Sequence, residues 1–339
     1  MSAAGIDTLD TGLTIGTLEI VPGLCLAPMA GITHSAFRRL VADFGGYGAL
    51  WTEMLSGKAL AGENLPRSPH TRRSDREGSV FYQLLLDGGE QVEAVVDTVG
   101  QLEPAGIDVN LACPAPEVVR RGGGAALFAD AGRMRGVVGK VRKRWGGPMT
   151  VKCRLGTKGP DWRAAFAERI RMLEDVGIDA LIVHPRFFDE KLKRTARREE
   201  LAWVCSRASV PVVASGDIGS LSTIARCLGA APGIRAVMVG RMAVVKPWVF
   251  AELRGASPVV DYGEVWMRLF DYISRDFESR EALRAIKEFN AYYARNFFFG
   301  HELFRKVGAS RTPHQAREAA EAFFRRPPRV VREPSVMGV

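Results

Sequence analysis

The chain has 339 residues, of which 47% are hydrophobic and 25% are charged, a composition typical of a globular protein rather than a disordered one. It has no apolar run long enough to span a bilayer and no N-terminal secretory signal, so we expect a cytoplasmic protein without membrane contact. The formal net charge of +9 would attract polyanions such as RNA, although a solvated basic surface explains it equally well.

The cysteine pattern argues against several kinds of site. Five cysteines are present, an odd number, and none forms a C-x-x-C pair. We therefore expect no disulfide framework, zinc ribbon or iron–sulfur cluster, and no metal. A single cysteine could still act in catalysis. The cysteines are Cys25, Cys113, Cys153, Cys205 and Cys227.

Short apolar runs, typical of strands buried on both faces, recur through the first three quarters of the chain. A hairpin is predicted over 13–20, turning at Gly16 and Thr17. Eight further strands are predicted at 24–29, 48–54, 79–86, 107–112, 149–155, 179–184, 210–215 and 235–240. Amphipathic helices are predicted between most of them, at 33–43 (with Thr33 as N-cap), 90–103, 131–144, 163–176 and 220–229.

Eight strands that alternate with helices indicate an α/β protein with a (β/α)8 TIM barrel. The alternative is an open doubly wound sheet, which usually has a G-x-G-x-x-G turn after its first strand, where this chain has APMAG. Beyond about residue 256 only helices are predicted, at 262–278, 280–299, 301–308 and 313–324, the last starting at Thr312-Pro313. We predict a barrel domain over 1–255, a helical domain over 256–325 and an extended tail over 326–339.

The active site of a TIM barrel lies at the C-terminal ends of its strands. Here almost every predicted strand ends in polar or charged side chains, which a purely structural barrel would not need. The segments ASGDIGS and VGRM follow the last two strands and offer glycines and an arginine, a pattern that favours a phosphate site over simple tight turns.

Several stretches occur in a fixed order: LAPMAGITHSAFRRL, FYQLLLDGGEQ, VNLACPAPEVVRRGGGAAL, VKCRLG, VHPR, VASGDI and VGRMAVVKPWVF. Together they resemble the signature set of the tRNA-dihydrouridine synthases, and the N-x-x-C-P element with its trailing glycines is the most specific. The resemblance runs from about residue 13 to 255 and continues more weakly through AIKEFNAYYARNFFFGHELF. It implies reduction of uridine to 5,6-dihydrouridine in tRNA, with FMN as cofactor and NADPH or NADH as reductant. We expect a monomer.

The resemblance also implies roles for individual residues. FMN would bind at the barrel mouth, with Pro28, Met29 and Ala30 against its rings and Gln83, Lys152 and His184 at its polar edge. The ribityl phosphate would be held by Ser215, Gly216, Asp217, Gly240 and Arg241. Asn110, Arg154 and Arg186 would contact the uracil, and Cys113 would donate a proton to C5. The helical domain would help to grip the RNA.

Cys113 and Lys152 each have an alternative interpretation. An unperturbed thiol has a pKa of roughly 8.5, so it is protonated at neutral pH and can donate, whereas most cysteines are simply buried. Cys113 lies in a loop between Ala112 and Pro114, which favours the catalytic role, and the other cysteines are expected in the core. Lys152 would donate to the flavin, but a barrel lysine could also form a Schiff base or an ion pair.

The chain departs from the family pattern at four places. Ala112 and Ser215 stand where the family usually has glycine and asparagine, and the loop after Gln83-Leu84 lacks an early glycine. The segment 187–200 also lacks the usual tyrosine and glycine and is rich in basic residues. We predict that this segment binds RNA electrostatically, through Lys191, Lys193, Arg194, Arg197 and Arg198.

Two further groups concern RNA. The cluster Arg67, Arg72, Arg73 and Arg76 follows the second predicted barrel strand, where it would neutralise phosphates or simply be a solvated loop. The aromatic residues Phe289, Tyr292, Tyr293 and Phe297 have helical spacing and are predicted to form the core of the helical domain rather than to stack on bases.

Other functions remain open from the sequence. An FMN-dependent oxidoreductase of free pyrimidines, similar to dihydroorotate dehydrogenase, would turn over orotate or uracil without RNA. A dihydrouridine synthase could act on ribosomal RNA instead of tRNA. A Schiff-base lyase built on Lys152 would bind no flavin, and a non-catalytic RNA-binding barrel would bind RNA without reducing it.

Overall fold

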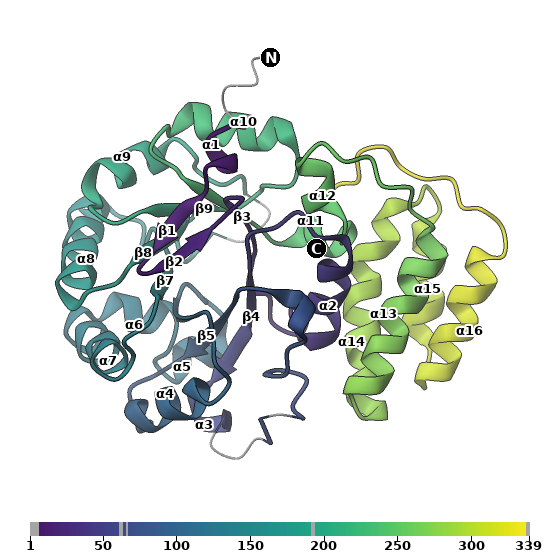
Figure 1. Ribbon diagram of the computed structural model, residues 1–339, viewed down its shortest axis with the longest axis horizontal. Coiled ribbons are helices and arrows are strands. Elements are labelled where there is room, and N and C mark those ends of the chain that lie inside the picture. The colour runs from purple at the N-terminus through teal and green to yellow at the C-terminus, as the bar shows by residue number, and fades with distance from the viewer. Residues whose placement is uncertain (1–6, 61–63, 66, 191–193, 337–339) are drawn as a thin grey trace.

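The strands close into a barrel. In the computed structural model, which describes residues 7–60, 64–65, 67–190 and 194–336, eight parallel strands follow one another in chain order and the last pairs with the first (Figure 1). The strands are β3 (Leu24–Leu26), β4 (Ala49–Ser56), β5 (Val80–Leu85), β6 (Gly106–Leu111), β7 (Met149–Arg154), β8 (Ala180–His184), β9 (Val212–Ser215) and β10 (Ala236–Val239). The predicted TIM barrel is confirmed, and the doubly wound alternative is wrong.

The predicted hairpin closes the N-terminal end of the barrel. It consists of β1 (Leu13–Ile15) and β2 (Leu18–Ile20), paired antiparallel. Leu13, Ile15 and Ile20 form one buried cluster with residues from the starts of the barrel strands, where Trp51 and Phe81 stack with ring centroids 4.4 Å apart. Apolar side chains fill this end of the barrel, so the candidate site is sought at the other end.

Helices surround the barrel, and five of them were predicted: α2 (Ser35–Phe44), α4 (Val92–Gly100), α7 (Ala131–Arg144), α8 (Trp162–Val176) and α10 (Leu221–Ala230). The N-cap of α2 is His34, whose ring accepts from the Phe37 amide at 3.3 Å, so the prediction of Thr33 is wrong. Thr33 instead accepts from the Met29 amide at 2.9 Å and stabilises the turn after β3. Further helices are α1 (Asp7–Asp10), α3 (Gly57–Leu60), α5 (Pro116–Arg120), α6 (Ala125–Ala129), α9 (Glu200–Arg207), α11 (Arg241–Val245) and α12 (Val249–Leu253).

The C-terminal part of the chain is helical and lies beside the barrel (Figure 1). It contains α13 (Tyr262–Asp276), α14 (Ser279–Tyr293), α15 (Gly300–Ala309) and α16 (Pro313–Phe324), and α16 has the predicted cap, Thr312. The single helix predicted over 280–299 is wrong, because the chain turns between α14 and α15. A side chain at Gly300 would place its Cβ 1.8 Å from the Ala294 carbonyl oxygen, so this close turn requires glycine.

The core of the helical part contains three of the four predicted aromatic residues, Phe289, Tyr293 and Phe297. No helix in the described part of the chain is long and apolar enough to cross a membrane. The chain after α16 turns back toward the barrel: Val330 forms an antiparallel bridge with Phe297, and the described residues then run to the barrel mouth near α11 (Figure 1).

Candidate active site

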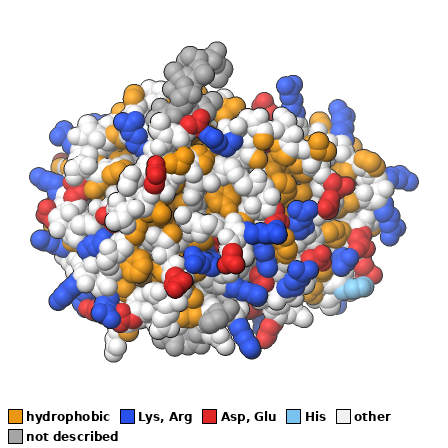
Figure 2. Space-filling model, in the orientation of Figure 1, with side chains coloured by type: hydrophobic (Ala, Val, Ile, Leu, Met, Phe, Trp, Pro, Cys, Tyr) orange, Lys and Arg blue, Asp and Glu red, His pale blue; other side chains and the backbone are white. Residues whose placement is uncertain are grey.

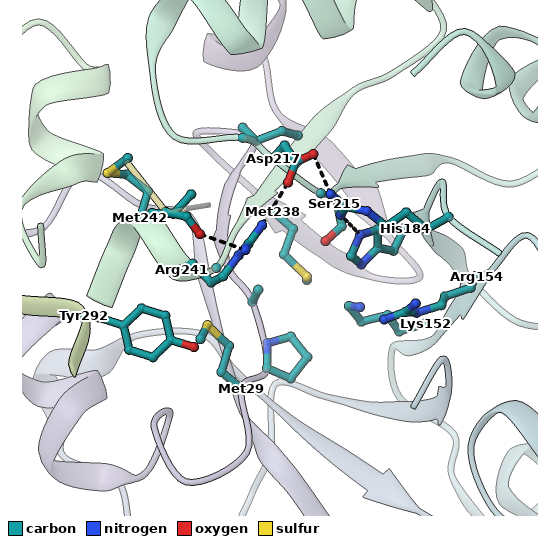
Figure 3. A pocket seen from close by; sticks show the side chains of 17 residues that line it. Met29, Lys152, Arg154, His184, Ser215, Asp217, Met238, Arg241, Met242 and Tyr292 are labelled. Atoms are coloured by element: carbon teal, nitrogen blue, oxygen red, sulfur yellow. Dashed lines mark hydrogen bonds and ion pairs between the residues drawn. The ribbon is translucent and has the colours of Figure 1, made fainter. Parts of the chain in front are cut away.

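A cavity of about 210 Å³ lies at the C-terminal ends of the strands, where β3, β7, β8, β9 and β10 meet (Figure 3). Tyr292 of α14 and Val336 of the tail complete its wall. The structure brings together most of the predicted site residues here: Pro28, Met29, Lys152, Arg154, His184, Arg186, Ser215, Gly216, Asp217, Gly240 and Arg241. Ala30, Gln83, Asn110 and Cys113 are not among the lining residues, and Ala30 lines a neighbouring hollow beside Tyr292.

One end of the cavity is organised around Asp217. Its carboxylate forms ion pairs with Arg186 at 2.6 Å and Arg241 at 2.9 Å (Figure 3). Burial opposes ionisation, but the hydrogen bond from Arg186 holds the pKa of Asp217 below its ordinary value. Gly216 has φ +105°, and a Cβ there would lie 2.8 Å from the His184 ring, so only glycine lets the backbone pass at this point.

Arg186 belongs to the wall of this end. Its side chain is fully buried, its Nε donates to the Arg194 carbonyl at 2.8 Å, and its Nη1 lies 2.5 Å from His184 Nε2. Burial and then the charge of Lys152 lower the pKa of His184 well below its ordinary value, so the ring is neutral and accepts from Arg186. Arg186 therefore fixes His184, Asp217 and the loop at Arg194 relative to one another.

Lys152 projects from β7 into the cavity and is 8% exposed. Burial, assisted by the charge of Arg154, lowers the pKa of its amine to about 8. Within the described residues the amine has no hydrogen-bond partner, although a buried polar group ordinarily has one. Lys152 is therefore open to an acceptor on a ligand.

The donor set indicates the kind of ligand that fits. Lys152, Arg154, Arg186 and Arg241 supply positive charge, and Asp217 is the one carboxylate that lines the cavity within the described chain. Gly216 and Gly240 have no side chain of their own, which lets a ligand come close to their backbone amides. These residues fit a ligand with an anionic end, such as a phosphate, and with acceptor atoms toward Lys152.

Cys113 follows β6 and is held by a buried polar chain. Asn110 Oδ1 accepts from the amides of Ala112 and Cys113, both at 3.0 Å, and Asn110 Nδ2 donates to Gln83 Oε1 at 2.8 Å. Gln83 in turn donates to Asp108 at 2.5 Å, and burial raises the pKa of that carboxyl to about 6. The chain thus fixes the loop that carries the thiol.

The Cys113 thiol is partly exposed, and burial raises its pKa. The glycine run after α5 packs directly on this loop: a Cβ at Gly124 would lie 2.5 Å from the Cys113 carbonyl oxygen, and the Ala125 amide donates to that oxygen at 2.9 Å. The cysteine is therefore a protonated thiol in a fixed loop. As predicted, Cys25, Cys153 and Cys227 are buried, whereas Cys205 is only partly so.

Several residues of the site were missed or misplaced by the sequence, among them Tyr292, Val336 and Asp108. Tyr292 was predicted as core of the helical domain, but Figure 3 shows it facing the cavity from α14 beside Met29. Nothing in helical periodicity reveals which neighbour an aromatic side chain meets. Val336 comes from a tail without any local pattern. Asp108 could have been found, because a carboxylate within a strand predicted to be buried needs a partner.

The chain is similar to one protein family and to several of its members. The model of the family described as dihydrouridine synthase (Dus) matches residues 25–326. The chain is 33% identical over 247 residues to tRNA-dihydrouridine synthase B of Xanthomonas campestris pv. campestris, covering 71% of each chain. It is 30% identical over 322 residues to the probable tRNA-dihydrouridine synthase of Mycobacterium tuberculosis strain H37Rv, covering 88% of this chain and 82% of that protein.

Solved structures show the same fold. The old yellow enzyme from Trypanosoma cruzi superposes with a TM-score of 0.54 at 10% identity, over 76% of this chain and 94% of that one. Morphinone reductase superposes with a TM-score of 0.53 at 11% identity, over 75% and 91%. At such low identity the likeness supports the barrel architecture alone.

Proposed function

The chain belongs to the dihydrouridine synthase family, and on this premise we propose that it reduces uridine to 5,6-dihydrouridine in tRNA with FMN as cofactor and NADPH or NADH as reductant. The observation that carries the proposal is the cavity at the barrel mouth, where cations, glycines and an unpartnered lysine converge. A phosphate at the Asp217–Arg241 end would direct the rest of the cofactor toward Lys152, across the mouth.

Different residues would contact different parts of the cofactor. Ser215, Gly216, Gly240 and Arg241 would hold the phosphate, with Asp217 orienting Arg241. Pro28 and Met29 would lie against the rings, with Ala30 beside them in the neighbouring hollow, and Lys152 and His184 would face the polar edge of the rings. Gln83 already donates from Nε2 to Asp108 and accepts at Oε1 from Asn110. Its proposed contact with the flavin would therefore use the second Nε2 hydrogen.

Bound reduced flavin supplies a hydride to uracil C6, and the protein must supply the proton for C5. Cys113, kept protonated by its raised pKa, is the proposed donor. Asn110 and Arg154 are proposed to contact the uracil. Asn110 also positions the cysteine, and Arg154 donates to the Phe187 and Glu190 carbonyls, which ties the substrate end to the 187–190 loop. Arg186 stays a predicted uracil contact, although its donors are engaged within the protein.

The test is a reconstitution with defined RNA. Purified protein with FMN and NADPH should convert uridine in an unmodified tRNA transcript to dihydrouridine, detected as a mass gain of about two hydrogens per site. Ribosomal RNA, free uracil and orotate serve as alternative substrates. Turnover of orotate without RNA would instead support a pyrimidine oxidoreductase. Protein that takes up no flavin would contradict the proposal and favour a Schiff-base lyase on Lys152 or an RNA-binding barrel.

Lys152 predicts a pH dependence of cofactor binding. Burial lowers its pKa from 10.5 to about 8, so the free protein loses this cation as the pH rises through about 8. Because only the charged amine donates strongly, FMN affinity should be constant below about pH 8 and fall as the pH rises above that value, until the amine of the FMN-bound protein also loses its proton. Fluorescence titrations of FMN at each pH measure this. Lys152→Met should bind FMN more weakly with a nearly flat profile, and equally steep profiles for both proteins would contradict the role.

The RNA contacts are proposed to lie where the barrel meets the helical part. Basic side chains gather there on the face seen in Figure 2, interspersed with acidic ones. In the predicted 67–76 cluster, Arg72 pairs with Asp276 and Arg76 with Asp43, whereas Arg67 and Arg73 are exposed and have no side-chain partner within the described chain. Arg67 and Arg73 are therefore the residues most available to phosphates.

Reversing both charges, as R67E and R73E, should weaken tRNA binding and flatten its salt dependence by about two units of log Kd against log salt. Filter binding at several salt concentrations measures the slope. The matched control reverses Arg135 and Lys143, which are exposed on α7, and should leave the slope unchanged. If reversal of the control pair changed the slope as much as reversal of Arg67 and Arg73, RNA binding would depend on the net charge of the protein and not on these two residues.

The predicted RNA-binding segment 187–200 is partly used inside the protein. Lys191 and Lys193 lie outside the described residues. Arg197 pairs with Glu190 at 2.6 Å, and Arg198 donates to the Asp217 carbonyl at 2.8 Å. Reversing all five charges would therefore also disturb the cavity wall. Arg194, whose side chain is exposed, is the described residue of this segment on which the proposed RNA contact can be tested cleanly.

A further inference from the structure

The C-terminal segment 329–336 crosses from the helical part to the barrel mouth. It is fixed at its start, where the Phe298 amide donates to the Arg329 carbonyl at 3.0 Å and the Val331 amide donates to the Asn296 carbonyl at 2.7 Å. It is fixed again at its end by two arginines. Arg295 Nη1 donates to the Ser335 carbonyl at 3.1 Å, and Arg241 Nη1 donates to the Val336 carbonyl at 2.9 Å.

A second cavity, of about 680 Å³, lies between this segment and the loop that leads into α10. Arg332–Val336 form one wall, and residues 217–223 form another. Asp217, Met242 and Val336 line both this cavity and the one at the barrel mouth, so the two adjoin at the Asp217–Arg241 end. Pro334 is the one buried residue in 332–336, so the segment is held mainly at its ends and not by a packed core.

Arg241 is the point where the segment meets the site. Its Nη2 donates to Asp217 Oδ1 at 2.9 Å while its Nη1 donates to Val336. Two acceptors on different nitrogens fix the plane of a guanidinium group, which is rigid and has five N–H donors. The remaining donors are then aimed without any further loss of freedom.

We propose that the segment Arg332–Val336 is part of the cofactor site: it positions Arg241 for the phosphate and covers the phosphate end, so that bound FMN leaves slowly. This rests on the proposed function, because FMN must be the ligand. The positioning is done by main-chain carbonyls, so it does not require particular side chains at residues 335 and 336. This explains why no local sequence motif marks the segment.

The test compares two truncations of the FMN-loaded protein. A chain ending at Pro334 loses the Ser335 and Val336 carbonyls but keeps the contacts of Arg329 and Val331 with the helical part. The control ends at Met337, because ending at Val336 would place a terminal carboxylate beside Arg241. The rate of FMN release is followed by the rise in flavin fluorescence on dilution. It should increase on the order of tenfold in the Pro334-ended chain, which loses two hydrogen bonds from charged donors, and stay unchanged in the control.

A double-mutant cycle with Arg241→Ala separates positioning from general destabilisation. Because part of the segment's effect acts through Arg241, the truncation should accelerate FMN release less in the Arg241→Ala protein than in the unsubstituted one. Arg241→Lys, which keeps the charge without the planar fork, replaces it if release from Arg241→Ala is too fast to measure. Equal acceleration in both backgrounds would overturn the positioning role.

The same measurements distinguish a wrong cofactor from a segment that has no part in the site. If the full-length protein takes up no FMN, the proposed function itself is wrong. If it holds FMN and the Pro334-ended chain releases it at the same rate, the function stands and the segment has no part in the site. Thermal unfolding of both truncated proteins without FMN checks that the fold is retained, and equal midpoints would assign any change in release to the site.

Discussion

Replacing Cys113 with alanine should slow uridine reduction roughly 100- to 10,000-fold, the usual cost of losing a positioned general acid. Hydride arrival at C6 leaves negative charge at C5 and its conjugated carbonyl, which a nearby donor must neutralise. Burial raises the pKa of the Cys113 thiol, so it keeps its proton at neutral pH, and Asn110 holds its loop in place. The side chain does not line the cavity proposed for FMN, so cofactor affinity should not change.

The two half-reactions separate this role from a structural one. Stopped-flow absorbance follows flavin reduction by NADPH and then reoxidation by tRNA. Cys113→Ala should be reduced at nearly the wild-type rate and reoxidised slowly, because only the second step needs the proton. Reoxidation at the wild-type rate would place the proton source elsewhere. Loss of both steps would indicate a collapsed loop.

Replacing Arg241 with alanine should weaken FMN binding by roughly 10- to 100-fold, the range expected for a lost charge-assisted hydrogen bond. Arg241 is mostly buried and is held by Asp217 and the tail, so its donors are already oriented. Asp217 keeps its second partner, Arg186, and should stay ionised, so the end of the cavity should not rearrange.

Equilibrium titration of the apoprotein with FMN measures this loss, and denaturation of the holoprotein should release FMN, because binding is noncovalent. Arg207→Ala is the control: it removes an exposed arginine from the last turn of α9 and leaves the barrel mouth untouched. Affinities that fall equally in both variants would mean that only net charge matters. Recovery of FAD, or of no flavin after reconstitution, would contradict the cofactor assignment.

Local patterns were enough for the barrel because each strand carries its own signal. A strand such as β8 (Ala180–His184) is apolar up to its last residue, since a barrel strand is buried on both faces, and the polar side chain that ends the run marks the mouth. Lys152, His184 and Asp217 could therefore be placed together before any contact was known. Local signals failed where two residues can play the same part. His34 and Thr33 can both cap α2, but the turn after β3 places the Thr33 hydroxyl where it accepts from the Met29 amide, and His34 is the cap.

The sequence by itself determined the order of strands and helices, the hairpin that closes one end, and the group of polar residues at the other, because these depend on burial and on neighbours in the chain. Only the tertiary structure decided which distant segments complete the site. Tyr292 lies more than a hundred residues beyond Lys152, and Val336 comes from a tail without periodicity, yet both line the same cavity. Their positions depend on how the helical part packs against the barrel, a sum of many weak contacts that no local pattern records.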